Sequence, residues 1–131
     1  MWELSISSKK RSEMIDITSK IQNLLNTHGI EDAHLCIYVP HTTAAITINE
    51  GADQSVQYDI IHALEKLVAF DSNYTHSEGN SDAHIKASLL GSSVTVIVKK
   101  GKMILGTWQH IFFYEGDGPR TRTVYVDALM S

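Results

Sequence analysis

Four short apolar runs, separated by only a few residues, occupy about the last forty positions of the chain. The strands expected there span residues 94–98, 103–107, 109–114 and 121–126. Strands joined by such short connections pair antiparallel, because a parallel pair needs a crossover of a dozen or more residues. The main helices are expected earlier in the chain, so the pattern favours the α+β class over a doubly wound parallel sheet.

The earlier part of the chain alternates strand and helix patterns. Strands are expected at residues 2–6, 35–39 and 42–48, main helices at 17–28 and 53–70, a short helix at 81–90, and a polar irregular stretch at 71–81. Asp53 stands where the second helix needs an N-cap, and Ser81 or Asp82 is the expected cap of the short helix. Loops as long as the polar stretch are usually functional or mobile.

Size and charge exclude several classes of protein. A chain of 131 residues can bury one core, and a single domain is expected over residues 1–131. Eleven Lys and Arg face fifteen Asp and Glu, whereas a nucleic-acid partner requires clustered positive charge. The chain has neither an apolar run of roughly 20 residues nor the pattern of a secretion signal. We therefore expect a cytoplasmic protein without nucleic-acid or membrane partners, with its single Cys36 buried in an apolar run.

Seven histidines are many for a chain of this length, and four of them stand beside turn residues. His41 follows Pro40 at a strand interruption, His76 and His84 flank the polar stretch, and His110 follows a turn. Imidazoles that converge from separate elements can hold Zn²⁺ with an open position, as catalytic sites do. We predict a metal site on His41, His76 and His84; the alternative is a set of surface polar residues on a long loop.

A pair of arginines follows the strand expected at 109–114. Arg120 and Arg122 project from the same face of an extended segment, because side chains alternate with a period of two. Arginine binds phosphate through two hydrogen bonds. The pair predicts a clamp for a phosphorylated small molecule, and a plain charged hairpin is the alternative.

Several motifs, taken together, resemble the secondary thiamine-phosphate synthase family, also called the YjbQ-like family. The matching runs are His41-Thr-Thr-Ala-Ala-Ile-Thr-Ile-Asn-Glu, His76, Asp82-Ala-His-Ile-Lys-Ala-Ser-Leu-Leu-Gly, Gly106-Thr-Trp-Gln and Gly118-Pro-Arg. They occur in the order and at the separations of that family, and the likeness extends over nearly the whole chain.

The resemblance implies a compact α+β protein with orthogonally packed sheets that assembles as a homotrimer. It also implies a low-level thiamine-phosphate synthase activity. In that reaction a hydroxymethyl-aminopyrimidine diphosphate loses pyrophosphate, and the nitrogen of a thiazole phosphate takes its place.

Carried onto this chain, the motifs give a set of candidate site residues. Catalytic roles are expected for Glu50, His41 and Arg120, substrate or phosphate binding for Arg120, Arg122, Asn49 and Trp108, and metal binding for His41, His76 and His84. Glu50 would accept a proton or add a metal ligand, and a pyrimidine ring would stack on an aromatic side chain such as Tyr74 or Trp108. Gly51 stands where the family pattern has Asn, which loosens the turn that carries Glu50.

Alternatives stay open for the identity of the metal ion and for the function. Pyrophosphate chemistry usually employs Mg²⁺, which prefers oxygen ligands, whereas three imidazoles favour Zn²⁺. A non-catalytic trimer that binds a metal and a phosphate metabolite stays open, as does a metal-dependent hydrolase of unknown substrate. The trimer has one argument of its own, because residues 111–114 carry apolar side chains on both faces of a strand, more than one core easily covers.

Overall fold

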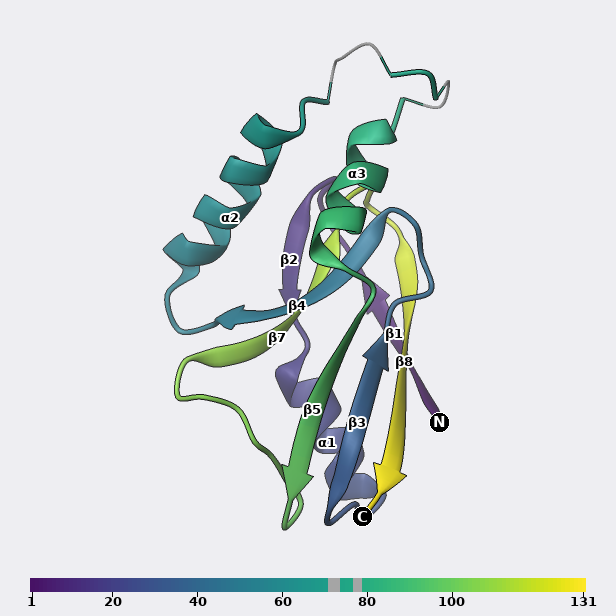
Figure 1. The fold of residues 1–131 in the computed structure, drawn as a ribbon, viewed down its shortest axis with the longest axis vertical. Helices are drawn as coiled ribbons and strands as arrows, with labels where there is room; N and C mark the ends of the chain where they lie inside the picture. Colours follow the sequence, from purple (N-terminus) through teal and green to yellow (C-terminus); the bar gives the residue numbers. More distant parts are fainter. Residues whose placement is uncertain (71–73, 77–78) are drawn as a thin grey trace.

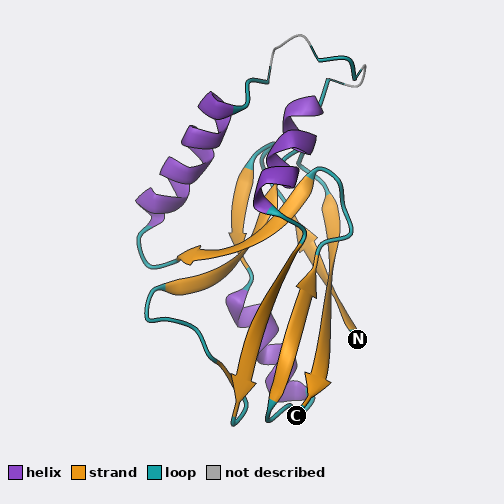
Figure 2. Cartoon of the chain, in the orientation of Figure 1, coloured by secondary structure: helices purple, strands orange, loops and turns teal. Residues whose placement is uncertain are grey.

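Two antiparallel sheets and three helices make up the described part of the chain. The computed structural model describes residues 1–70, 74–76 and 79–131. The elements are β1 (Trp2–Ser7), β2 (Glu13–Asp16), α1 (Thr18–Thr27), β3 (Ala33–Tyr38), β4 (Ala44–Glu50), α2 (Gln54–Leu67), α3 (Ser81–Leu90), β5 (Ser93–Lys99), β6 (Lys102–Met103), β7 (Gln109–Glu115) and β8 (Thr121–Met130). Figure 2 colours them by type.

Each sheet has its own strand order. The five-stranded sheet runs β1-β8-β3-β5-β6 and the three-stranded sheet runs β2-β7-β4, with antiparallel pairing throughout. In Figure 1, β4 and β7 cross the direction of β3, β5 and β8 at a steep angle. The α+β class with antiparallel sheets is therefore confirmed.

The main core lies between the two sheets and α1. Along β3 every second side chain is buried, including Leu35 and Ile37, so one face of the five-stranded sheet is covered. Ile21 of α1 and Phe113 of β7 pack into the same core. Cys36 points to the opposite face of β3 and is exposed, so the expectation that it is buried was wrong.

The position of β7 differs from two expectations about the last forty residues. The four strands expected there do not pair one after another within a single sheet, because β7 pairs with β2 and β4 while β5, β6 and β8 belong to the other sheet. As the middle strand of its sheet, β7 is covered on both sides: Phe113 enters the main core, and Tyr114 packs with Ala87 of α3. Its two apolar faces are thus buried within one chain and do not require a partner.

Several element boundaries also differ from the sequence pattern. β2 was missed, and the strand expected at 103–107 shortens to the two residues of β6. α2 ends at Leu67 rather than near Phe70, and Asp53 is its N-cap as predicted, accepting the Ser55 N–H at 3.0 Å. Part of the irregular stretch at 71–81 lies outside the described residues. No helix of the described ranges is long and apolar enough to cross a membrane.

Candidate functional site

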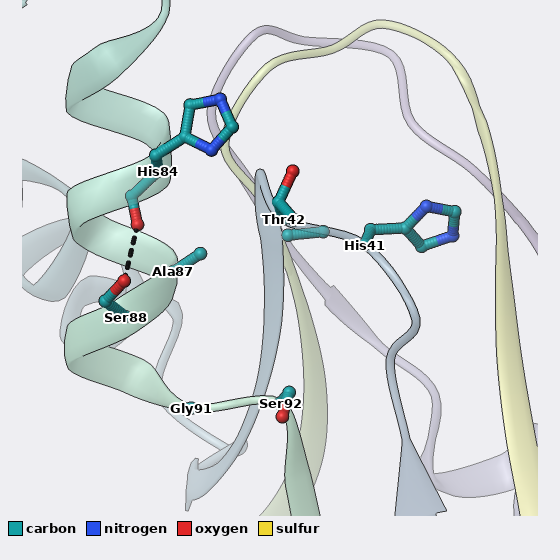
Figure 3. A pocket seen from close by; sticks show the side chains of 8 residues that line it. His41, Thr42, His84, Ala87, Ser88, Gly91 and Ser92 are labelled. Atoms are coloured by element: carbon teal, nitrogen blue, oxygen red, sulfur yellow. Dashed lines mark hydrogen bonds between the residues drawn. The ribbon is translucent and has the colours of Figure 1, made fainter.

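A polar pocket opens where the β3–β4 loop, the start of α3 and the segment before β8 meet. It has a volume of about 480 Å³ and is lined by Pro40, His41, Thr42, Thr43, Asn80, His84, Asp117, Arg120 and Arg122. An adjoining hollow of about 390 Å³ shares His41, Thr42 and His84 and continues along α3 (Figure 3). We call the two together the His41–His84 pocket.

The β3–β4 loop brings His41 to this pocket. Pro40 has no N–H to give to a sheet, so the strand pattern stops there and resumes at Ala44. The pairing of Ala44 with Glu115 of β7 places the loop next to the segment that leads to Arg120. Residues distant in the sequence therefore share one end of the two sheets.

His41 is held as a neutral imidazole. Its Nε2 accepts the backbone N–H of Thr123 at 3.0 Å, and since that N–H can only donate, the ring proton resides on Nδ1. Burial, followed by the Arg122 charge, lowers the pKa of His41. The side chain is thus a hydrogen-bond donor through Nδ1 at neutral pH.

The three imidazoles predicted to bind a metal are only partly brought together. The rings of His76 and His84 meet edge to face, with centroids 5.3 Å apart. His41 lines the same pocket as His84, but Figure 3 shows its ring directed away from α3, and its Nε2 is taken by Thr123. Within residues 1–70, 74–76 and 79–131, no three His, Cys, Asp or Glu side chains are placed to hold an ion. Within the described residues the three imidazoles thus do not converge on one point, and the metal site stays a prediction.

Arg122 is engaged inside the protein rather than presented to a ligand. It is 3% exposed, and its guanidinium forms two hydrogen bonds with the carboxylate of Glu115 and one of 2.9 Å with Thr43 Oγ1. Burial raises the pKa of Glu115, but the bonds from Arg122, Asp117 and Ser8 outweigh it, so the pKa is lowered. Arg122 and Glu115 therefore form a buried ion pair whose charges cancel, and Arg122 lines the pocket.

Arg120, by contrast, keeps a half-exposed guanidinium at the pocket. Its backbone N–H donates to Ser8 Oγ, and its guanidinium bonds Asp117 Oδ2 at 2.9 Å. The same Asp117 oxygen accepts the Asn80 amide N–H at 2.9 Å. Exposed ion pairs of this kind are weak, so an anionic ligand can compete for the guanidinium. The predicted two-arginine clamp therefore reduces to Arg120.

α3 begins at the pocket with Asn80, not Asp82, as its N-cap. The Asp82 carboxylate is fully buried and accepts two hydrogen bonds of 3.0 Å from Arg11 and one of 3.3 Å from Lys86. The cap predicted at Ser81 or Asp82 was wrong, because the helix already begins at Ser81 and the Asp82 carboxylate neutralises two cations instead. Its spacing to Lys86 is visible in the sequence, but the Arg11 contact is not.

Asn49, Glu50 and Trp108 lie away from the His41–His84 pocket. The register pairs Glu50 with Gln109 at one end of the β4–β7 ladder and Ala44 with Glu115 at the other. Six residue steps of strand separate these ends by about 20 Å. Glu50 Oε2 accepts the N–H groups of Ala52 and Asp53, closing the turn before α2.

Sequence reasoning missed several residues of the pocket. Asn80, Asp117 and Thr43 line it, and Glu115 lies beneath it. Asp117 stands between two glycines close to Arg120, which is a local signal of a segment that can approach a ligand. Glu115 gave no such signal, because its partner Arg122 is defined only by the three-dimensional arrangement.

Known proteins match this chain over nearly its whole length. A family model described as UPF0047 protein YjbQ-like matches residues 2–131. The UPF0047 protein MJ1081 of Methanocaldococcus jannaschii is 54% identical, covering 98% of this chain and 94% of the relative. The UPF0047 protein YugU of Bacillus subtilis is 48% identical, covering 96% of each chain.

A solved structure agrees with the topology. The crystal structure of a YjbQ/UPF0047 family protein from Clostridium acetobutylicum superposes with a TM-score of 0.95 at 46% identity. It covers 98% of this chain and 100% of that chain. The descriptions of these proteins state no activity, so the chemistry is inferred from the pocket.

Proposed function

This chain belongs to the YjbQ-like UPF0047 family, and we propose that it is an enzyme that binds phosphorylated small molecules in the His41–His84 pocket. The observation that carries the proposal is the meeting of the half-exposed Arg120 guanidinium and the neutral His41 imidazole in one polar pocket. Both groups donate hydrogen bonds, which phosphate oxygens accept. A pocket of about 480 Å³ is within the range that small-molecule ligands occupy.

The start of α3 supports the same ligand class. The N-terminus of a ten-residue helix carries partial positive charge and N–H donors, which favour anions. The one acidic side chain of its first turn, Asp82, is turned away and neutralised by Arg11 and Lys86. The carboxylate therefore adds little repulsion toward an anion at this helix end.

As the reaction we propose a transfer of the thiamine-phosphate synthase type. The ring nitrogen of a thiazole phosphate attacks the methylene carbon of a hydroxymethyl-aminopyrimidine diphosphate, the carbon–oxygen bond breaks, and pyrophosphate leaves with the electron pair. Such a step needs negative charge stabilised on the leaving oxygen more than it needs a protein nucleophile. Arg120 supplies a cation, and Nδ1–H of His41 supplies a donor.

The first experiment measures binding of inorganic pyrophosphate by isothermal titration calorimetry. Losing a charged hydrogen bond costs about 1.5–3 kcal/mol, so Arg120→Ala should weaken binding at least about tenfold. Lys99→Ala removes an exposed positive charge on β5 and serves as the control. Equal binding by wild type and Arg120→Ala would show that Arg120 does not hold the anion.

The second experiment separates catalysis from binding. The pyrimidine diphosphate and thiazole phosphate are mixed with excess protein in a single-turnover assay that detects thiamine phosphate. Product formed by wild type and lost in Arg120→Ala supports the transferase. Pyrophosphate binding without product supports the alternative, a non-catalytic phosphate-metabolite-binding protein, and rules out this reaction.

A further inference from the structure

A second cluster of titratable groups lies at the other end of the β4–β7 ladder from the pocket. The Nδ1 atom of His110 lies 2.6 Å from Oδ2 of Asp16. Both side chains are partly exposed, His110 to 36% and Asp16 to 41%. The pair joins β7 to the end of β2, and its role is independent of the phosphate pocket proposed above.

Asp16 is fixed by hydrogen bonds on its other oxygen. Oδ1 accepts the Thr18 N–H at 3.0 Å and the Thr18 hydroxyl at 2.6 Å, and that hydroxyl oxygen in turn accepts the Ile111 N–H. Burial raises the pKa of Asp16, but the bonds from Thr18 and His110 outweigh it and lower the pKa. Asp16 is thus an oriented, ionised carboxylate at neutral pH.

His110 occupies a space that only glycine leaves. A methyl group on Gly51 would overlap the His110 ring, and the Gly51 N–H bonds the carbonyl oxygen of Trp108 at 2.9 Å. The ring also stacks on Phe112, with centroids 6.4 Å apart. His110 is therefore held by Asp16, Gly51 and Phe112, and its position is not that of a freely moving surface side chain.

This orientation leaves one nitrogen for chemistry. With Nδ1–H donating to Asp16, the neutral ring carries its lone pair on Nε2, and no hydrogen bond to Nε2 is found among the residues that the structure describes. A carboxylate that holds an imidazole by Nδ1 keeps the tautomer whose Nε2 accepts protons, and stabilises the imidazolium that results. Trp108, whose carbonyl oxygen accepts the Gly51 N–H, has a side chain that is 62% exposed.

We propose that Asp16 and His110 form a second catalytic site, a general base that hydrolyses small activated acyl esters. Nε2 of His110 accepts a proton from water as the water oxygen attacks the acyl carbon. The tetrahedral intermediate then expels the alcoholate with its electron pair, leaving a carboxylic acid, and the imidazolium returns its proton to solvent. Such esters need no cation to hold a phosphate, which suits a site whose nearest charged partner is a carboxylate.

The test uses p-nitrophenyl acetate and the release of p-nitrophenolate. General-base catalysis contributes at least about 100-fold, so His110→Asn should lower the protein-dependent rate by about that factor. Gly51→Ala leaves both catalytic groups in the chain but displaces the ring, and it should lose a similar share of the rate. His34→Asn, at an exposed histidine of β3, is the matched control and should keep the wild-type rate.

If the hydrolysis rate falls equally in His110→Asn and His34→Asn, any exposed imidazole accounts for the activity, and the proposal is overturned. A second measurement needs no variant. Long-range ¹H–¹⁵N NMR spectra of the wild-type protein should show that the neutral form of the His110 ring is protonated on Nδ1 and unprotonated on Nε2. The opposite tautomer would overturn the proposal, whatever the variants do, and neither result bears on pyrophosphate binding at Arg120.

Discussion

Replacing Arg122 by Met leaves a carboxylate buried without its cation. Glu115 is fully buried and Arg122 is 3% exposed, so the substitution removes the only guanidinium that contacts this carboxylate in the described residues. Breaking a buried ion pair on one side costs about 3–5 kcal/mol. The free energy of unfolding of the whole chain is expected to be about 6–20 kcal/mol. The loss caused by this substitution is therefore a large part of the stability.

The assay is urea unfolding followed by circular dichroism at pH 7. Arg122→Met should lower the free energy of unfolding by about 3–5 kcal/mol, and the double variant Arg122→Met/Glu115→Leu should recover most of it, because an apolar pair leaves no buried charge. A loss under about 1 kcal/mol, or no recovery in the double variant, would refute the buried pair.

The pH dependence of stability tests the same buried ion pair. The lowered pKa of Glu115 means that its ionised form stabilises the wild type above the ordinary carboxyl pKa, and that this stability is lost as pH falls through the folded value. Without Arg122, burial keeps the carboxyl protonated to higher pH. The difference in stability between wild type and Arg122→Met should therefore shrink on acidification, and a constant difference from pH 7 to about pH 4 would contradict the assignment.

Three further predictions concern the core, α3 and the assembly. Phe113→Ala removes a fully buried ring and should cost about 3–5 kcal/mol in urea unfolding; a loss below 1 kcal/mol would place this ring outside the core. Asp82→Asn leaves the buried Lys86 ammonium without its carboxylate and should cost about 3 kcal/mol or more, while wild-type stability would contradict the Arg11–Asp82–Lys86 contacts. The homotrimer stays a prediction, which sedimentation equilibrium tests: three copies of the 14.6 kDa chain are expected, and a single copy would contradict it.

Local patterns predicted the elements that depend on local chemistry. The apolar stripe of α2 and its Asp53 cap depend only on residues of that helix and the position before it. The buried face of β3 follows from the alternation of apolar and polar residues along the strand. The assignment of β7 to a separate sheet could not be predicted, because its covering on both faces comes from α3 and the opposite sheet. Strand partners are a property of the folded chain, and short connections alone do not fix them.

The site shows the same division. His41, His84 and Arg120 were predicted as site residues, and they line one pocket. The sequence gives no means of seeing that Arg122 is neutralised by Glu115, or that Nε2 of His41 is taken by the backbone of Thr123. Glu50 is close to His41 in the motif, yet a strand separates the two side chains because both ends of β4 carry motif residues.

Binding of an anion in the His41–His84 pocket is tested most directly by ¹H–¹⁵N NMR of the wild-type protein titrated with inorganic pyrophosphate. We expect saturable shifts in the backbone amides of residues 41–43, 80–84 and 117–123, with much smaller changes at residues 49–51 and 108–110. No saturable change at the first group, or larger changes at the second, would contradict the account.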